Sequence, residues 1–415
     1  MARRAVVTGL GLVTPAGRTV ETFWENVVEG RSPVRRISSF DPSPFSTQIA
    51  AEITDFDPED YMDRRDARRM DRFAQFATAA AALALSDAGL DPLPAGVDPG
   101  RVAVWVGSGT GGIATLERQV RVLAAAGPRR VSPFTVPMMI ANMAAAQVAL
   151  RWGFRGPCGG PVTACATGTN AVGDALRMIQ RGEADIVLAG AAEAAITPIG
   201  LAAFCSAQAM STRNDDPEGA CRPFDRARDG FVMGEGAGVL VVEEAAAAAS
   251  RGARIYAEVL GFAANADAYH LVLPRPDGSR AGTCMALALR DAGLSPERVG
   301  YVNAHGTGTP ANDGAETRAI KLAFGRHAYR LAVSSTKPAT GHLMGAAGAV
   351  ELAVCALALA RGVVPPTMNL SDPDPECDLD YVPGRAREVD LEACLSVSLG
   401  FGGHNACVVL GRWRD

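Results

Sequence analysis

Cys165 combines a reactive side chain with a local sequence that could put it to use. It lies in the stretch VTACATGTNAVGDAL, where an extended run gives way to a helical one. A thiol at the start of a helix feels the positive end of the helix dipole, which lowers the pKa of a cysteine from about 8.5 toward the thiolate range. Cys165 is therefore a candidate nucleophile, although an inert buried cysteine fits the same residues.

His305 and His342 are two of only five histidines in the chain. They lie in the loops NAHGTGTP and STKPATGHLMG, where predicted strands have ended and glycines free the backbone. A single loop histidine is commonly just solvated. Because both follow strand ends, as Cys165 does, the three residues together form a candidate site.

The other cysteines and the glycine-rich stretches give weaker signals. The nine cysteines are scattered and contain no C-x-x-C pair, so neither a zinc site nor a disulfide framework is expected. Gly107, Gly109 and Gly112 match the G-x-G-x-x-G dinucleotide fingerprint, but no acidic residue stands about 20 positions further on to hold a ribose. We therefore expect these glycines, and those of GEGAG and GFGG, to serve turns and close packing.

The composition predicts a globular, reduced, cytoplasmic protein. The 415 residues are 48% hydrophobic and 20% charged, which suffices for one large domain or two fused halves. A formal net charge of −5 gives no overall attraction to nucleic acid or anionic membranes. The N-terminal MARRAVVTGLGLV predicts a first strand rather than a signal peptide. The longest apolar windows are interrupted by Glu193, Pro198 and Glu351, so no membrane span is expected.

Short β-branched runs alternate with alanine-rich helical segments, a pattern typical of α/β layers with strands buried on both faces. The first series predicts strands at 4–10, 101–109 and 184–190 and helices near 73–88 and 138–150. The second series predicts strands at 255–263, 299–306, 330–335 and 394–410 and helices at 281–292, 314–323 and 345–361.

The shared rhythm of the two series predicts an internal duplication. The strand and glycine at 6–9 resemble those at 259–261, and VAVWVGSG resembles LAVSSTKPATG. We therefore expect two halves, 1–250 with Cys165 and 251–415 with His305 and His342, joined after the alanine run at 245–249.

Four motifs in order, VTACATG, NAHGTGTP, SSTKPATGH and GFGGHN, resemble those of the elongating β-ketoacyl-acyl carrier protein synthases, the type II ketosynthases of the thiolase superfamily. The likeness covers nearly the whole chain and includes TGLGLVTP, RRMDRFAQF and DAYH. It implies a thiolase-like α/β fold of five αβαβα layers, built from two duplicated βαβαβαββ halves and working as a dimer.

The resemblance also implies a role for each reactive residue. Cys165 would take an acyl group from an acyl carrier protein as a thioester. His305 and His342, as neutral imidazoles, would donate hydrogen bonds to the malonyl thioester oxygen while carbon dioxide departs. The N–H groups of Cys165 and Phe401 would form an oxyanion hole, and the Phe401 ring would gate the acyl pocket. The supporting polar residues are Lys337, Asp313, Glu316, Thr307 and Thr309. By sequence alone the charged members are surface ion pairs, worth about 0–1 kcal/mol.

Departures from the family's usual residues bear on the acyl chain. Thr110 and Thr135, expected with Phe204 along the acyl pocket, stand where bulky apolar residues are usual. Each removes apolar area and adds a hydroxyl that needs a partner. These changes favour a polar or unsaturated acyl chain.

Further departures bear on metals and partners. Some relatives hold a structural cation near Asn303, Glu351 and Ser396, but Val397 offers no side-chain ligand, so no metal is expected. No cofactor is expected, because phosphopantetheine arrives on the acyl carrier protein. Gln208 stands where an arginine often helps to bind this acidic partner. The basic residues expected to dock the carrier, unless they are only solvated helix charge, are Arg65, Arg68, Arg69, Arg129 and Arg130.

The resemblance leaves the pathway open. Decarboxylative Claisen condensation in fatty-acid synthesis and the same chemistry in a type II polyketide or polyene pathway both fit, as a homodimer or beside a chain-length-factor-like subunit. A non-catalytic chain-length factor would lack Cys165, and a degradative thiolase would have a cysteine near His404. Initiating synthases have asparagine in place of one histidine, so His342 favours elongation. Neither nucleic acid nor a membrane is an expected partner.

Overall fold

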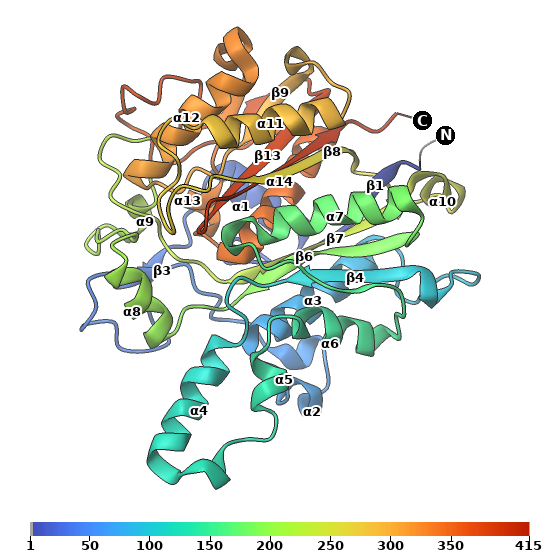
Figure 1. The fold of residues 1–415 in the computed structure, drawn as a ribbon, viewed down its shortest axis with the longest axis vertical. Helices are drawn as coiled ribbons and strands as arrows, with labels where there is room; N and C mark the ends of the chain where they lie inside the picture. The colour runs from blue at the N-terminus through green and yellow to red at the C-terminus, as the bar shows by residue number, and fades with distance from the viewer. Residues whose placement is uncertain (1–2, 415) are drawn as a thin grey trace.

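A computed structural model describes residues 3–414 as a mixed sheet of ten strands with helices on both sides (Figure 1). The strands of this sheet are β1 (Ala5–Val13), β4 (Val102–Gly107), β5 (Cys158–Gly159), β6 (Ile186–Glu193), β7 (Gly236–Glu244), β8 (Ala257–Ala266), β9 (Val299–Asn303), β10 (Ala332–Ser334), β13 (Ala393–Gly400) and β14 (His404–Gly411). Two small ribbons pair β2 (Arg35–Arg36) with β3 (Ile49–Ala50) and β11 (Val363–Val364) with β12 (Arg387–Glu388).

Helices connect most of these strands. They are α1 (Val20–Glu29), α2 (Arg64–Ala67), α3 (Arg72–Asp87), α4 (Ile113–Ala126), α5 (Thr135–Met139), α6 (Met143–Trp152), α7 (Thr167–Arg181), α8 (Pro198–Ser206), α9 (Pro217–Ala220), α10 (Ala245–Ser250), α11 (Ser279–Asp291), α12 (Pro310–Phe324), α13 (Lys337–Thr340) and α14 (Ala347–Arg361). Their ends follow local chemistry. The Asp71 carboxylate caps α3 by accepting from Phe73 N–H, and α7 ends at Gly182, which has a left-handed φ of 70°.

The sheet repeats one topology twice. Its order is β10-β9-β13-β14-β8-β1-β7-β6-β4-β5, so each half lays five strands in the same relative order. In each half the first two pairings outward from the centre are antiparallel and the next two are parallel. The chain order β1-α3-β4-α6-β5-α7-β6-β7 repeats as β8-α11-β9-α12-β10-α14-β13-β14. The predicted duplication of βαβαβαββ halves is confirmed.

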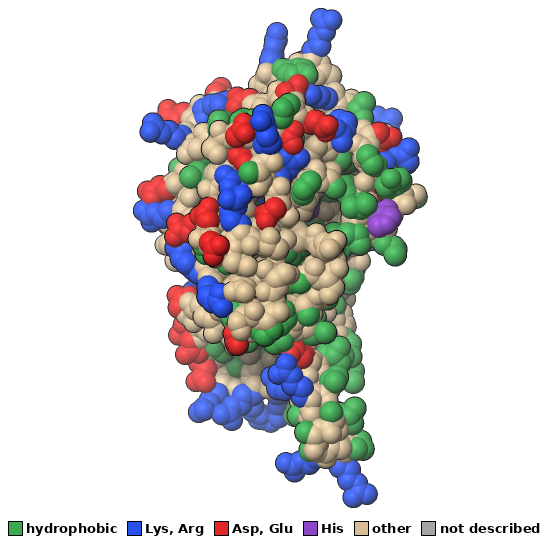
Figure 2. All heavy atoms as spheres, turned by 90° about the vertical axis from the view of Figure 1, so that its left-hand side faces the viewer, with side chains coloured by type: hydrophobic (Ala, Val, Ile, Leu, Met, Phe, Trp, Pro, Cys, Tyr) green, Lys and Arg blue, Asp and Glu red, His purple; other side chains and the backbone are tan. Residues whose placement is uncertain are grey.

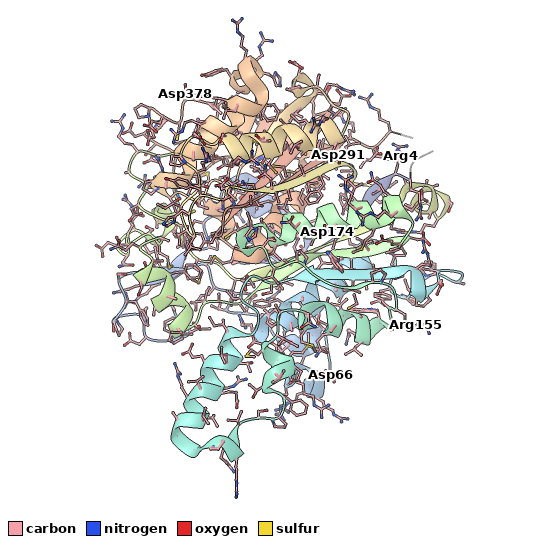
Figure 3. All side chains as sticks on the ribbon, in the orientation of Figure 1. Arg4, Asp66, Arg155, Asp174, Asp291 and Asp378 are labelled. Atoms are coloured by element: carbon pink, nitrogen blue, oxygen red, sulfur yellow. The ribbon has the colours of Figure 1, made fainter. Side chains whose placement is uncertain are left out.

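The repeated helices form the five predicted layers. Helices α3 and α6 pack on the outer face of the first half, and α11, backed by α12, packs on the outer face of the second. Between the halves lie α7 and α14, which contact each other and strands of both halves. Polar contacts also join α7 to both sides: Asp174 accepts from the Trp105 indole N–H on β4 at 2.9 Å, and Arg177 pairs with Asp291 on α11 at 2.6 Å (Figure 3).

The segment Met344–Arg361, which contains α14, is long and apolar enough to cross a membrane, but 89% of it is buried inside the fold. It is the core helix of the middle layer. The predicted strands and most predicted helices lie where expected. The join at residue 250 stays a prediction, because β1 and β8 pair directly and make the sheet continuous across the two halves.

Two sequence predictions were wrong. The expected helix at 138–150 is broken into α5 and α6, because the Met139 carbonyl accepts from Gly112 N–H instead of continuing a helix. The likeness between VAVWVGSG and LAVSSTKPATG does not mark equivalent strands. Strand β4 corresponds to β9 in order and pairing, whereas β10 corresponds to the edge strand β5.

Candidate active site

Cys165 lies in a strained turn immediately before α7. Ala164 has a positive φ of 49°, a conformation that costs a residue with a side chain about 1–3 kcal/mol. The turn is held by the Thr167 hydroxyl, which donates to the Ala164 carbonyl at 2.7 Å and accepts from Thr163 N–H at 3.0 Å. Met344, also at positive φ (51°), makes the equivalent turn before α14. The duplicated fold thus brings two such turns together at the middle layer, with Cys165 in one of them.

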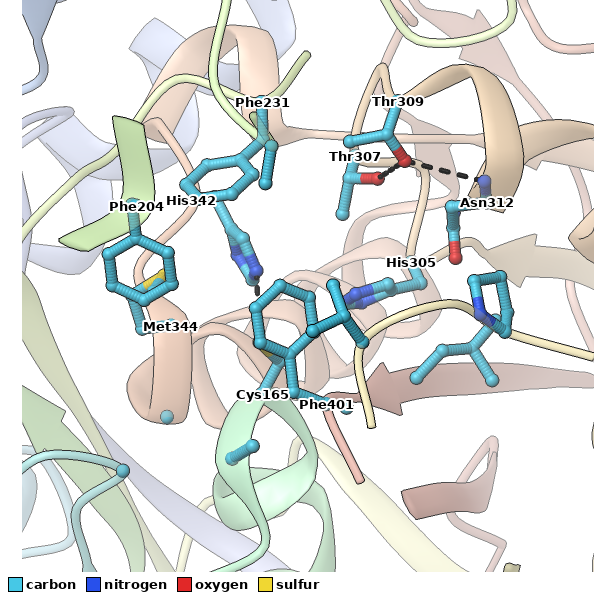
Figure 4. A pocket seen from close by; sticks show the side chains of 18 of the residues that line it. Cys165, Phe204, Phe231, His305, Thr307, Thr309, Asn312, His342, Met344 and Phe401 are labelled. Carbon is cyan, nitrogen blue, oxygen red and sulfur yellow. Dashed lines mark hydrogen bonds between the residues drawn. The ribbon is translucent and has the colours of Figure 1, made fainter. Parts of the chain in front are cut away.

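A cavity of about 250 Å³ opens over the Cys165 thiol. His342 and His305 both point their rings toward this thiol from the opposite wall (Figure 4). The His342 Nε2 atom lies 3.2 Å from Cys165 Sγ, and the two imidazole rings are 5.3 Å apart, centroid to centroid, at 84°. All three residues are 2–6% exposed. The predicted grouping of Cys165, His305 and His342 is present in the structure.

Backbone contacts hold the His342 ring in place. His342 N–H donates to the Val232 carbonyl at 2.7 Å, and its carbonyl accepts from Gly234 N–H at 2.9 Å. The Phe231 ring packs edge-on against the imidazole at 5.3 Å. The segment 231–234 therefore positions His342, a link that the sequence motif STKPATGH does not reveal.

Buried charged side chains hold the backbone around His305 in place. Glu316 accepts from His305 N–H at 2.6 Å and from Gly306 N–H at 2.8 Å. The Lys337 ammonium donates to the His305 carbonyl and pairs with Glu351. These charged groups are only 0–3% exposed, so the expectation of surface ion pairs was wrong. Removing one partner of a buried pair costs about 3–5 kcal/mol, much more than at a surface.

Asp313 anchors the loop that follows His305. Its carboxylate accepts from Phe224 N–H at 2.8 Å and from Gly308 N–H at 3.3 Å, and lies 3.6 Å from the buried Arg228 guanidinium. On the same loop the hydroxyls of Thr307 and Thr309 are 3.0 Å apart and face the cavity (Figure 4). All the predicted supporting residues therefore lie at or directly behind the site.

Burial sets the protonation of the centre. It lowers the pKa of His305 and that of His342 well below 6.5, with the nearby Lys337 charge acting in the same direction, so both imidazoles are neutral at pH 7. Burial also raises the pKa of the Cys165 thiol to about 12, against the charge of Lys337 and a backbone N–H donated by Phe401. Burial raises the pKa of Glu316 to about 7. The arrangement joins a nucleophilic thiol to two neutral hydrogen-bond donors.

The end of β13 brings Phe401 to the nucleophile. A Cβ placed on Gly400 would lie 2.7 Å from the Thr163 carbonyl and 3.2 Å from Cys165 N, so only glycine allows this approach. The Phe401 ring lies 6.2 Å from that of Phe204 across the cavity. The backbone of GFGG thus does more than make a turn: it brings the Phe401 N–H to Cys165 Sγ.

Of the three predicted acyl-pocket residues, Thr110 and Phe204 line the cavity. The Thr110 hydroxyl already has a partner, since it donates to the buried carboxylate of Glu193. Thr135 lies on α5, where its hydroxyl donates to the Ser132 carbonyl at 2.6 Å, and it does not line the cavity of its own chain.

The sequence reasoning missed a role for Glu193 at the cavity wall. Its fully buried carboxylate accepts from the N–H groups of Gly109, Thr110 and Gly345 at 2.9–3.1 Å. It therefore joins the GSGTGG loop to the turn that follows His342. A charged residue ending the apolar strand IVLAGAAE was the available signal. The GSGTGG glycines pack closely, as expected: a Cβ on Gly107 would lie 2.2 Å from the Pro161 carbonyl.

The predicted docking residues lie on two neighbouring surface segments. Arg65 belongs to α2, followed by Arg68 and Arg69, whereas Arg129 and Arg130 form a turn between α4 and α5. The Arg69 guanidinium lies 4.9 Å over the ring of Phe134, which brings the first segment against the start of α5. Their role in carrier binding stays a prediction.

The expectation that no metal is bound near Asn303 also stays a prediction. Within residues 3–414, the Asn303 Oδ1, Glu351 Oε2 and Ser396 Oγ atoms are buried without a hydrogen-bond partner. Asn303 and Ser396 are paired neighbours on β9 and β13. Their oxygens suit a hard cation, although the Val397 side chain adds no ligand.

Comparison with known protein families shows to which family the chain belongs. The model of the β-ketoacyl synthase N-terminal domain matches residues 2–248, and that of the C-terminal domain matches residues 256–371. The chain belongs to the β-ketoacyl synthase family. Curated relatives extend the match to the full length: the chain is 51% identical to 3-oxoacyl-[acyl-carrier-protein] synthase 2 of Synechocystis sp. over 99% of both chains, and 50% identical to that of Coxiella burnetii over 100% of this chain and 99% of the relative. It is a condensing enzyme of the acyltransferase type.

Solved structures of this family share the fold. A β-ketoacyl synthase from Burkholderia phymatum superimposes with a TM-score of 0.93 at 37% identity, covering 99% of this chain and 100% of the other. The ishigamide ketosynthase/chain length factor gives 0.92 at 37%, and a complex of a type II polyketide synthase acyl-carrier protein with its ketosynthase gives 0.92 at 34%, each over 100% of both chains. The thiolase-like fold predicted from sequence is confirmed.

Proposed function

We propose that this β-ketoacyl synthase extends acyl chains held on acyl carrier protein in fatty-acid synthesis, with Cys165 as the acyl acceptor. The observation that carries the proposal is the Cys165 Sγ atom 3.2 Å from His342 Nε2, at the bottom of a cavity whose wall also holds His305. Curated relatives at 50–51% identity carry the name 3-oxoacyl-[acyl-carrier-protein] synthase 2.

The first step transfers the acyl group. The Cys165 sulfur attacks the carbonyl of the acyl thioester, and the departing phosphopantetheine thiol takes up the proton that Cys165 loses. The tetrahedral oxyanion accepts hydrogen bonds from the N–H groups of Cys165 and Phe401. The positive end of α7 favours the developing thiolate and so opposes the effect of burial on the Cys165 pKa.

The second step makes the new carbon–carbon bond. Malonyl-carrier protein loses carbon dioxide, and the electron pair of the broken bond passes into an enolate. His305 and His342 stabilise the enolate oxygen by donating hydrogen bonds, which neutral imidazoles can do without proton transfer. The enolate carbon attacks the Cys165 thioester, and Cys165 leaves and regains a proton. The product is a 3-oxoacyl thioester two carbons longer.

The neutral state of the two histidines is itself testable. With only five histidines, a chain carrying 13C-labelled imidazoles gives few signals, and His305→Ala and His342→Ala variants assign two of them. We expect these two signals to stay unshifted from pH 8 to pH 6, because burial lowers the pKa of both residues well below 6.5. A midpoint at or above 6.5 for either residue would contradict the account. The lowered pKa values of His305 and His342 also affect stability. Below about pH 6.5 the unfolded chain binds more protons at these two residues than the folded chain does, so their contribution to the free energy of unfolding falls as pH falls.

The cavity predicts how the accepted chain length can be changed. Thr110→Ile adds volume at the wall and will lower acylation by long saturated acyl-carrier proteins roughly tenfold, since overpacking costs about 1–3 kcal/mol, while short chains load as before. Thr110→Val removes the hydroxyl donated to Glu193 without adding volume, so it separates lost hydrogen bonding from lost space. Acylation rates over a panel of saturated and polyunsaturated acyl-carrier proteins measure both effects.

The same panel tests the pathway. We expect the unmodified chain to prefer saturated acyl chains, because the Thr110 hydroxyl is already bonded to Glu193 and does not require a polar substrate. A strong preference for polyunsaturated or oxygenated chains would instead support a polyketide or polyene pathway. Similarity to the ketosynthase of a type II polyketide synthase, at 34% identity, supports that alternative less than the curated relatives at about 50% support fatty-acid synthesis.

We further propose that the enzyme is a cytoplasmic dimer joined at the face around the edge strand β5. Exposed apolar side chains lie on α4, α5, α6 and the segment after β5: Leu116, Leu123, Val136, Leu150 and Val162. Figure 2 shows apolar side chains down one edge of the protruding part that carries α4, with the end of the protrusion basic. A contribution of Thr135 to an acyl pocket requires such a partner, because Thr135 does not line its own cavity. The mass and subunit composition of the purified oligomer distinguish a second copy from a chain-length-factor-like subunit as the partner.

A further inference from the structure

The centre of the site also has the donor atoms of a metal site. One atom from each of Cys165, His305 and His342 lies within 4.8 Å of the other two. Among residues 3–414 this is the only group of three or more cysteine, histidine or acidic side chains arranged closely enough to hold an ion. It was not evident from sequence, because the three residues are far apart in the chain and no ligand spacing motif is present.

The donor set suits zinc. One thiolate and two neutral imidazoles are borderline-soft ligands, and three protein ligands with one open position form a common tetrahedral zinc arrangement. With Zn–S bonds of about 2.3 Å and Zn–N bonds of about 2.0 Å, tetrahedral geometry places the sulfur and each nitrogen about 3.5 Å apart and the two nitrogens about 3.3 Å apart. Cys165 Sγ and His342 Nε2 are 3.2 Å apart, close to the spacing that zinc requires, and a ring nitrogen of His305 lies within 4.8 Å of both. The cavity supplies an entry path and room for a fourth, water ligand.

The surrounding charges tolerate a cation. The ammonium of Lys337, the one cation that acts on the Cys165 sulfur among the described residues, is paired with the Glu351 carboxylate, which offsets its positive charge. The imidazole Nδ1 atoms of both histidines have no hydrogen-bond partner among the described residues. Because loss of such outer support typically weakens a metal site 10–100-fold, we expect weaker binding than at a structural zinc site.

We propose that Cys165, His305 and His342 bind Zn2+ when Cys165 carries no acyl group, and that the bound metal blocks acylation. A Zn–S bond forms as the Cys165 thiol releases its proton to solvent, and the metal exchanges water ligands for the sulfur and the two ring nitrogens. The inhibition rests on the proposed role of Cys165 as nucleophile, whereas the binding does not. The consequence is that free zinc and acyl-carrier protein compete for one sulfur.

Cobalt(II) provides a direct readout, because a four-coordinate Co2+ thiolate site has a sulfur-to-metal charge-transfer band and strong visible absorption. The metal-free chain is titrated in a Cys158→Ser background, which removes the exposed cysteine. We expect one equivalent of Co2+ to produce both bands and one equivalent of Zn2+ to abolish them. Cys165→Ala will lose the charge-transfer band, and His305→Ala or His342→Ala will weaken binding roughly tenfold or more. A six-coordinate spectrum without a sulfur band, or the same spectrum in Cys165→Ala, overturns the proposal.

The acyl-enzyme separates this proposal from the proposed function. Loading Cys165 with an acyl group should abolish the Co2+ bands, and Zn2+ should slow acylation of the free enzyme in proportion to the metal-bound fraction. Normal acylation of Cys165 with no metal bands refutes the metal site alone. If the parent chain shows the metal bands but the Cys165→Ala variant still accepts acyl groups, the role of Cys165 as nucleophile is refuted and the metal site is not.

Discussion

Cys165→Ala will abolish formation of the acyl-enzyme. Within the described chain, Cys165 is the one cysteine that has its sulfur next to both an imidazole nitrogen and the Phe401 N–H at the start of a helix. The thiolate is the nucleophile in acyl transfer, and alanine offers none. Intact-protein mass after incubation with an acyl-carrier protein will show the acyl adduct in the parent chain and none in the variant.

A matched control is Cys158→Ser, which removes the exposed cysteine on β5 and should load as the parent does. Thermal unfolding of both variants checks that the fold is intact, since replacing the Cys165 sulfur with hydrogen leaves only a small space. An undiminished acyl adduct in Cys165→Ala would overturn the assignment of the nucleophile.

Cys165→Gln will separate the two half-reactions. The glutamine amide resembles an acylated cysteine in size and polarity, while His305 and His342 remain in place. The variant should therefore condense nothing but still release carbon dioxide from malonyl-carrier protein. Release of 14C-labelled carbon dioxide, measured alongside the search for a 3-oxoacyl product, tests both parts.

Adding His305→Ala to Cys165→Gln will lower decarboxylation about 10²–10³-fold, the usual effect of removing one donor to a developing oxyanion. Glu316→Gln in the same background is the matched control for disturbance of the loop, because it alters the group that holds the His305 backbone and leaves the imidazole. Decarboxylation at the parental rate after loss of His305 would contradict its role in stabilising the enolate.

The grouping of the reactive residues could be predicted because each follows a strand end in a distinctive motif. In an α/β fold, strand ends of one direction meet at one edge, so Cys165, His305 and His342 were expected together. The duplication could also be predicted from the alternation of strands and helices. Which strands correspond in the two halves could not be predicted, because β5 and β10 are only two and three residues long and are too short to show a hydrophobic pattern.

The burial of the charged network could not be read from the chain. The residues next to Lys337, Glu316 and Glu351 in the sequence do not indicate whether these side chains face solvent or the middle layer. Only the packing of the helices that carry them, α13, α12 and α14, determines that they are buried. The Glu193 carboxylate is similar: five donors from two segments more than 80 residues away converge on it, and no spacing rule links them. Long-range hydrogen bonds of this kind follow from topology rather than from local patterns.

A single-turnover reaction on the acylated enzyme tests the central claim most directly. The chain is first loaded from a saturated acyl-carrier protein, freed of excess donor, and then mixed with malonyl-carrier protein. The account predicts that the acyl mass disappears from the Cys165 peptide as the carrier gains a 3-oxoacyl group two carbons longer. Acyl-enzyme that persists unchanged, or that releases only free acid, would contradict it.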